Sequence, residues 1–379
     1  RQLAAGASLT IPGTEAGGYG VSCPVRRDRG AAAQDCGTDR MLPNTVGFYH
    51  DPYICFIDDY SKPILLNIGR AGRQCVSDRV LNCGLRIRTE RRGAFFYDFS
   101  NVPEGSTDGF EGTDEERRLR IADATRYRVE VITAHMLCIH SMTQHETSCG
   151  GDYTRVVATH LVSVDSDLKK AHGATNAILL AQFQVDDIRG LWRAPEISHD
   201  IRRTVPVEIA DDSVTALDWL IERDGWDANG QQPLLPGQRL GVLESLALLS
   251  QAGRALSEGL LRRSIVDSWA VSERMLMAGW KAHVRDRLGG GPNGEPAKLD
   301  RDSRRTIERW DARSVMQSML LAGILDRRVY EWLDRARDHR NKWLHGRTTT
   351  VDRQAAAHSL YTAMMMVNWT YGLDIRIAC

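Results

Sequence analysis

The stretch VYEWLDRARDHRNKWLH, residues 329–345, decides how the C-terminal part of this chain is expected to fold. From its first residue onward, apolar or small residues recur at Leu333 and Ala336, the next step is Arg340, and the following one is Trp343. Steps of four and three residues are typical of the buried stripe of an amphipathic helix. Because a cation in such a stripe is costly unless it is paired, Arg340 is predicted to be either a structural ion-pair partner or an active group.

Helical patterns surround this stretch and predict an antiparallel bundle of four or five helices over residues 238–379. Gly346 is suited to end the helix that carries Arg340, because glycine readily adopts the left-handed conformation found after a last helical turn. The other helices are expected at 240–288, with a break near Ser257, at 303–322, and after Asp352. Asp326 and Asp352 are suited to cap the starts of the final two helices.

The chain before a stretch rich in Gly, Pro and Asn at 227–237 has a mixed pattern. Residues 113–143 predict a long helix, although their second half also suits a strand, and residues 213–223 predict a short helix. Apolar and β-branched runs predict strands at 53–57, 64–68, 81–87, 94–99, 155–164 and 177–183. We therefore predict an α+β protein, with a mixed α/β region over 1–230 followed by the all-α bundle.

Composition points to a cytoplasmic protein without membrane contact. A hydrophobic content of 42% and a charged content of 26% are typical of globular chains, and no run approaches the roughly 18 apolar residues of a membrane span. The 8 cysteines are scattered without a C-x-x-C pair, which favours reduced thiols. Basic residues outnumber acidic ones from Arg254 to Arg347. This excess suits a polyanionic partner, although charge runs are usually only solvated faces.

Arg340, Asn341 and His345 together form a set of side chains suited to phosphodiester cleavage. A guanidinium matches phosphate oxygens in shape and charge, so Arg340 would hold the scissile phosphate. Histidine titrates near neutral pH, so His345 would take the proton of a ribose 2′-hydroxyl or give one to the leaving oxygen. Asn341 would orient either partner. This chemistry needs no metal and no cofactor, and we expect neither.

Helix geometry constrains how Arg340 and His345 meet. Five residues span about 500° of an ideal helix, so the two side chains point roughly 140° apart. Either the helix end at Gly346 turns His345 back toward Arg340, or two copies of the motif complete each other across a two-fold axis; we expect the homodimer. Glu273 interrupts the apolar stripe of its own helix as Arg340 does. The two are expected to pair, either structurally or to orient the guanidinium for phosphate.

The pattern Arg340-Asn341-x-x-x-His345, preceded by LLAGIL at 320–325 and SERML at 272–276, resembles the signature of the HEPN superfamily. The resemblance covers roughly Leu240 to Tyr371. It implies a helical bundle that dimerises around the motif and, in many members, a metal-independent endoribonuclease that leaves 2′,3′-cyclic phosphate ends. Such nucleases occur in bacterial toxin–antitoxin and antiphage defence systems.

Carried over by position, Arg340 and His345 would be catalytic, Asn341 and Glu273 supporting, and RNA the partner. Toxins of this superfamily that a nucleotidyltransferase silences carry a tyrosine two residues after the histidine, where this chain has Arg347. That regulation is therefore not expected, and the region 1–230 is predicted to be a sensor or recognition module for a ligand or partner.

Two other functions also fit the sequence. The bundle could be a non-catalytic HEPN domain that binds RNA or nucleotide as a dimerisation scaffold, or the function could lie wholly in residues 1–230. A metal site is conceivable among closely spaced His and Cys residues, but their spacing matches no common zinc pattern, and a structural role is expected for them. These residues are His135, Cys138, His140, His145 and Cys149.

Overall fold

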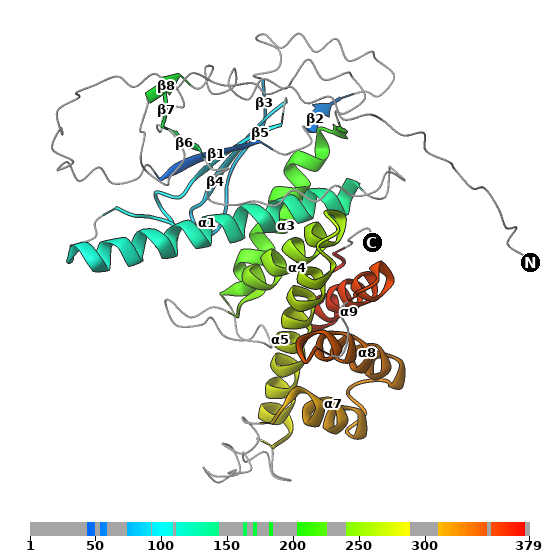
Figure 1. The fold of residues 1–379 in the computed structure, drawn as a ribbon. Coiled ribbons are helices and arrows are strands. Elements are labelled where there is room, and N and C mark those ends of the chain that lie inside the picture. Colours follow the sequence, from blue (N-terminus) through cyan, green and yellow to red (C-terminus); the bar gives the residue numbers. More distant parts are fainter. Residues whose placement is uncertain are drawn as a thin grey trace, which may run out of the picture. The chain divides into compact units, whose positions relative to one another are not determined.

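The protein is α+β, as predicted, with a mostly antiparallel set of strands and a larger set of helices (Figure 1). Residues 41–379 form one compact unit, and the description below concerns this unit alone. The computed structural model describes residues 44–49, 54–58, 74–91, 93–108, 111–143, 162–164, 170–172, 182–184, 203–225, 240–288, 310–346 and 350–375.

The main sheet has 7 strands in the order β3-β4-β5-β1-β6-β7-β8, and every neighbouring pair is antiparallel. A separate parallel pair joins β2 to β9. The strands are β1 (Thr45–Tyr49), β2 (Ile54–Ile57), β3 (Cys75–Val80), β4 (Arg86–Glu90), β5 (Ala94–Asp98), β6 (Val162–Val164), β7 (Lys170–His172), β8 (Gln182–Gln184) and β9 (Arg203–Pro206).

Two of the predicted strands are confirmed, at 53–57 by β2 and at 94–99 by β5. The strand predicted at 81–87 is wrong in its first half, because Leu81 and Leu85 close a turn between β3 and β4. The amide of Leu81 donates to the carbonyl of Leu85 at 2.8 Å. Gly84 has a φ of +90° there, and a Cβ on it would lie 2.9 Å from the carbonyl oxygen of Asn101, so only glycine fits this turn.

The remaining strand predictions fall largely outside the described residues. Those at 155–164 and 177–183 are confirmed only at their ends, by β6 and β8. The strand predicted at 64–68 lies wholly outside, as do the first forty residues of the chain.

The long helix predicted at 113–143 is confirmed as α1 (Asp114–Thr143), and the alternative of a strand in its second half is wrong. Thr113 and Glu116 form a reciprocal capping box at its start: the Thr113 amide donates to the Glu116 carboxylate at 2.9 Å, and the Glu116 amide donates to the Thr113 hydroxyl at 3.3 Å. The second half looked strand-like because almost every residue in it is buried, which removes the helical alternation of apolar and polar residues.

The remaining helices follow the predicted bundle, except that the helix predicted at 303–322 begins only at Ala312, because Asp311 caps its start by accepting from the Ser314 amide. The break expected near Ser257 separates α4 from α5, and Gly259 adopts a φ of +74° between them. Asp326 and Asp352 cap their helices as predicted. The helix bounds are α3 (Glu208–Asp224), α4 (Val242–Ser257), α5 (Leu261–Leu288), α7 (Ala312–Leu321), α8 (Arg327–Leu344) and α9 (Arg353–Tyr371).

Helices α1 and α3 connect the sheet to the bundle. Both touch the sheet, and both pack against α4, which in turn packs against α5 and α9 (Figure 1). One hydrophobic core therefore extends from Val46 to Ile375. The boundary predicted at 230–238 lies outside the described residues, and the division into two domains stays a prediction. No described helix is both long enough and apolar enough to cross a membrane.

Candidate functional site

Helix α8 carries all three residues of the predicted motif. Asp326 starts this helix by accepting a hydrogen bond from the Val329 amide at 2.8 Å. Leu333 and Ala336 are fully buried against the bundle, which confirms the predicted stripe. Arg340 continues that stripe but is only half-buried, so its guanidinium lies at the edge of the core.

Arg340 is held by its neighbour in the motif and not by an acid. Its Nη1 donates to Oδ1 of Asn341 at 2.8 Å. The expected ion pair with Glu273 is absent from the single chain, because no salt bridge joins Arg340 to any carboxylate in the part of the chain that is described. Glu273 is also half-buried on α5, between the buried Trp269 and Leu276. Partial exposure lets water solvate both charges, so neither needs a partner.

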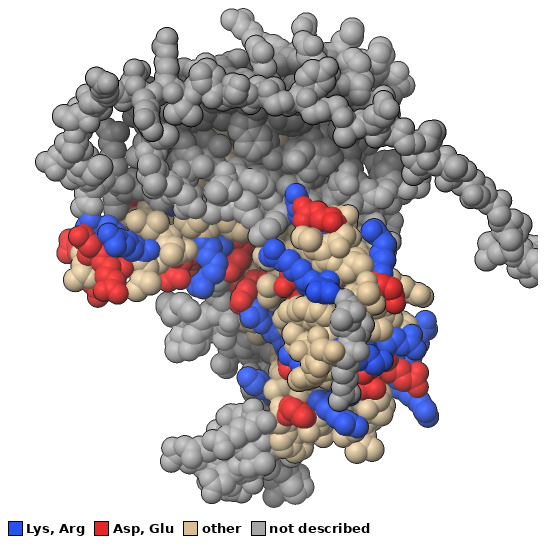
Figure 2. Space-filling view, viewed as in Figure 1, with Lys and Arg blue, Asp and Glu red and all other residues tan. Residues whose placement is uncertain are grey.

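Basic and acidic side chains lie next to one another on the face of the molecule drawn in Figure 2. The acidic residues of α8 are paired with other bases of the same helix. Their ion pairs are Arg327–Glu331 at 3.1 Å, Arg337–Asp334 at 2.7 Å and Lys342–Asp338 at 2.6 Å. The guanidinium of Arg340 therefore keeps its charge available for an external anion. Asn341 fixes one edge of the guanidinium by hydrogen bonding and adds no negative charge.

His345 lies directly after the last residue of α8 and is exposed. Its amide still donates to the Asn341 carbonyl at 3.0 Å, with φ −93° and ψ 18°, and the chain turns only at Gly346, which has a φ of +64°. The helical hydrogen-bond pattern thus reaches the His345 amide, although the dihedrals of His345 itself are no longer helical, and its Cα lies roughly 140° around the axis from that of Arg340. The alternative that the helix end turns His345 back toward Arg340 is not favoured by this geometry.

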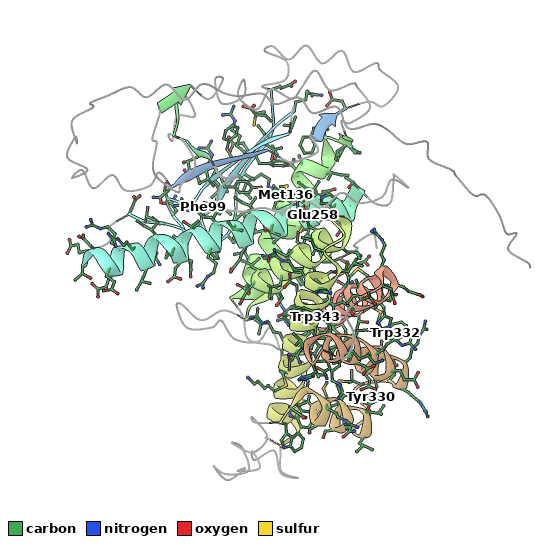
Figure 3. All side chains as sticks on the ribbon, viewed as in Figure 1. Phe99, Met136, Glu258, Tyr330, Trp332 and Trp343 are labelled. Carbon is green, nitrogen blue, oxygen red and sulfur yellow. The ribbon has the colours of Figure 1, made fainter. Side chains whose placement is uncertain are left out.

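Trp343 anchors the motif end of α8 to the neighbouring helix α5. The guanidinium carbon of Arg262 lies 6.0 Å from the centroid of the Trp343 ring, which is at the outer limit of a cation–π contact. Figure 3 shows Trp343 and Trp332 toward opposite ends of α8. Trp343 is half-buried beside α5, whereas its neighbours Lys342 and Leu344 are exposed.

Sequence reasoning missed a second group of side chains on α8, which recur at steps of four and three residues along one side of the helix. The guanidinium carbon of Arg328 lies 4.6 Å from the Trp332 ring centroid. Trp332 meets Tyr361 of α9 edge to face at 5.6 Å, and His339 meets His358 of α9 at 6.0 Å. The spacing of Arg328, Trp332, Arg335 and His339 could have revealed this group from the sequence.

The His and Cys residues weighed as a metal site include a core histidine whose two nitrogens are both occupied. The Ser213 hydroxyl donates to the Ala210 carbonyl at 3.2 Å, so it accepts from Nε2 of His135 at 3.0 Å. Nδ1 of His135 then accepts from the Tyr97 hydroxyl at 2.8 Å. Burial lowers the pKa of His135 to about 3 and raises the pKa of Cys138 to about 12.

Those two groups therefore act as neutral parts of the core, as expected from their spacing. No cluster of three or more potential metal ligands occurs among the residues that are described, a set that excludes His145 and Cys149. No protein-family model, curated protein sequence or solved structure shows a significant match to this chain.

Proposed function

We propose that the chain is a metal-independent endoribonuclease of the HEPN type whose cleavage site forms between two copies of α8. The observation that carries this proposal is the state of Arg340. Its guanidinium has no carboxylate partner among the described residues and is oriented by Asn341, and the exposed His345 lies five residues further along. A guanidinium that is held by an amide and not by an acid keeps its full charge for a phosphate.

In this mechanism, Arg340 binds the scissile phosphate through parallel N–H groups and stabilises the charge that develops on its oxygens. His345 accepts the 2′-hydroxyl proton while O2′ bonds to phosphorus. The P–O5′ bond then breaks, and O5′ takes up the proton that the His345 imidazole has accepted. The products are a 2′,3′-cyclic phosphate and a free 5′-hydroxyl, so no metal ion and no water enter this step.

The first test is cleavage of single-stranded RNA in the presence of EDTA. Arg340→Ala and His345→Ala are each expected to lower the rate by about a hundredfold or more, as is typical when a general acid–base group is removed. Lys342→Ala is the matched control, since Lys342 is an exposed base of the same helix that is already paired with Asp338; its rate should equal that of the wild type. Equal rates for all four proteins would assign the cleavage to a contaminant.

A site shared between two chains can be tested by mixing two inactive variants and measuring the activity that returns. If each site takes Arg340 from one chain and His345 from the other, a mixture of Arg340→Ala and His345→Ala chains contains dimers with one intact site. An equimolar mixture should regain about a quarter of wild-type activity, since half of randomly exchanged dimers are mixed and each restores one of two sites. If the mixture is as inactive as its components, Arg340 and His345 of one site do not come from different chains.

A non-catalytic RNA-binding scaffold is the second candidate, and one observation favours it. Arg340 and His345 point to different sides of a single helix, so neither chain by itself holds them around one phosphate. RNA binding without any cleavage in EDTA or in Mg²⁺, together with an unchanged affinity in His345→Ala, would select the scaffold.

A further inference from the structure

A row of basic and aromatic side chains lies on α8 where this helix packs against α9. Arg328, Trp332 and Arg335 are spaced by four and three residues, so they share one side of α8. Tyr361 of α9 joins them through its edge-to-face contact with Trp332. We name these four residues the basic aromatic strip. It is separate from Arg340, which lies on the core-facing side of the helix.

The charge of the strip is not neutralised by any residue that the structure describes. The acids of α8 pair with Arg327, Arg337 and Lys342, whereas no carboxylate partner exists for Arg328 or Arg335 in the described part of the chain. Both of these arginines are exposed. The basic residues of α8 thus form two sets. One set is paired with acids of the same helix, and the other, Arg328 and Arg335, is exposed to solvent beside the aromatic rings.

The aromatic rings of the strip are held in place and left partly open. Arg328 lies over the Trp332 ring at 4.6 Å, and the Tyr361 ring stands at 71° to it. Tyr361 remains 43% exposed. A fixed ring with an accessible face beside an arginine is the arrangement on which nucleic-acid bases stack. An acidic peptide would use the arginines but would gain little from the ring faces.

We propose that the basic aromatic strip binds single-stranded RNA, with a base stacked on Tyr361 and phosphates held by Arg328 and Arg335. Single strands are favoured because a base must leave its duplex stack to reach an aromatic face. Arg335 precedes Arg340 by five residues, or about 7.5 Å along the helix axis, so a bound strand extends toward the end of α8 that carries the motif. The proposed role of the strip depends on the proposed function only in the choice of RNA over other polyanions.

The experiment measures equilibrium binding of the full chain to a labelled single-stranded RNA whose 2′-oxygens are methylated, which blocks cleavage. Tyr361→Ala and the double variant Arg328→Ala/Arg335→Ala should each weaken binding about tenfold, whereas Tyr361→Phe keeps the ring and should bind like the wild type. The control is Arg327→Ala/Arg337→Ala, which removes the same charge from the same helix but from the paired set. Its affinity should stay within about twofold of the wild type, because those arginines are already neutralised.

Equal losses in the two double arginine variants would overturn the strip, because they would show attraction to net charge alone. Equally tight binding of duplex RNA, or of a polyglutamate peptide, would overturn the stacking of a base. Melting temperatures of the variants confirm that the fold is kept. The binding measurement does not depend on cleavage. If the chain never cleaves RNA but binds it through the strip, the strip proposal stands and the nuclease proposal is wrong. If the chain cleaves RNA but every strip variant binds like the wild type, the nuclease proposal stands and the strip proposal is wrong.

Discussion

His135 shows how far burial controls a single residue of this protein. It is completely enclosed between the sheet and α3, and its ring meets those of Phe95 and Tyr97 edge to face at 5.6 Å and 5.8 Å. With the Ser213 hydroxyl donating to Ala210, Nε2 of the neutral ring donates to Ser213 and Nδ1 accepts from Tyr97. A protonated His135 would carry its charge in a fully buried position, and the Tyr97 hydroxyl would have to turn to accept from Nδ1.

Stability should therefore fall as the pH drops below 6.5. An unfolded His135 takes up a proton near its ordinary pKa of 6.5, whereas the folded one resists protonation until about pH 3. The unfolded state thus binds more protons across this window, and this one group lowers the free energy of unfolding by up to about 1.4 kcal/mol per pH unit. Urea unfolding of the wild type and of His135→Gln at several pH values tests this, and the variant should show the shallower decline. Parallel pH profiles would contradict it.

The candidate site shows which residue properties the sequence reveals. The stripe of α8 predicted that Arg340 would lie toward the core, and it does so at the edge. The pairing of Arg340 with Glu273 failed, because periodicity assigns each residue a side of its helix but not the depth at which that side is buried. The contact between Arg340 and Asn341 involves adjacent residues and has no periodic signal. The edge-to-face contact of Trp332 with Tyr361 depends on how α8 and α9 cross, which the sequence does not state.

At the scale of elements, α8 depends on its cap to present the motif. The helix has a strongly polar composition and buries only Leu333 and Ala336 completely, so packing contributes less to it than to its neighbours. The carboxylate of Asp326 satisfies one of the free amides of its first turn. Fraying from this end would first disturb the basic aromatic strip.

Replacing this cap should cost measurable stability. We expect Asp326→Ala to lower the free energy of unfolding by about 1 kcal/mol, and Asp326→Asn to change it by much less, because asparagine caps nearly as well as aspartate. Thermal melts followed by circular dichroism give both values. If the alanine variant melts like the wild type, α8 is held by tertiary packing alone.

Helices were more predictable than strands in this chain, for a physical reason. Helices α7, α8 and α9 each have a capping aspartate at the start and a glycine with positive φ just after the end. Strand β3 was missed because most of its residues are exposed and its sequence, CVSDRV, carries three polar residues. Its place is fixed by pairing with β4, including the ion pair between Arg86 and Asp78 at 2.8 Å, and such pairing is not local information.

At the scale of the whole molecule, α4 joins the two parts that the sequence separates. This helix is buried on nearly all sides, because α1 and α3 cover part of it while α5 and α9 cover the rest. Its leucines Leu243, Leu246 and Leu249 are fully enclosed. The bundle over 238–379 is therefore not closed by its own helices.

Removing residues 1–230 should consequently unfold or aggregate the remaining bundle, since the surface of α4 that α1 and α3 bury would face water. Removing only residues 1–40 should leave the melting temperature nearly unchanged, because residues 41–379 form the compact unit. Size-exclusion chromatography and melting curves of the two truncated chains test this. A monodisperse, cooperatively melting fragment 238–379 would show that the bundle folds alone, and only then would its activity report on a sensor role for the N-terminal region.

The junction of α3 with α4 indicates where the chain can accept an insertion. The Asp224 carbonyl accepts from the Leu240 amide at 2.7 Å, and its carboxylate accepts from the Val242 amide at 2.6 Å. These two hydrogen bonds hold the end of α3 close to the start of α4, on either side of positions 226–239 in the sequence. Extra sequence inserted between positions 226 and 239 leaves both anchoring amides in place, so a tag or a whole guest domain there is expected to leave α3 and α4 intact.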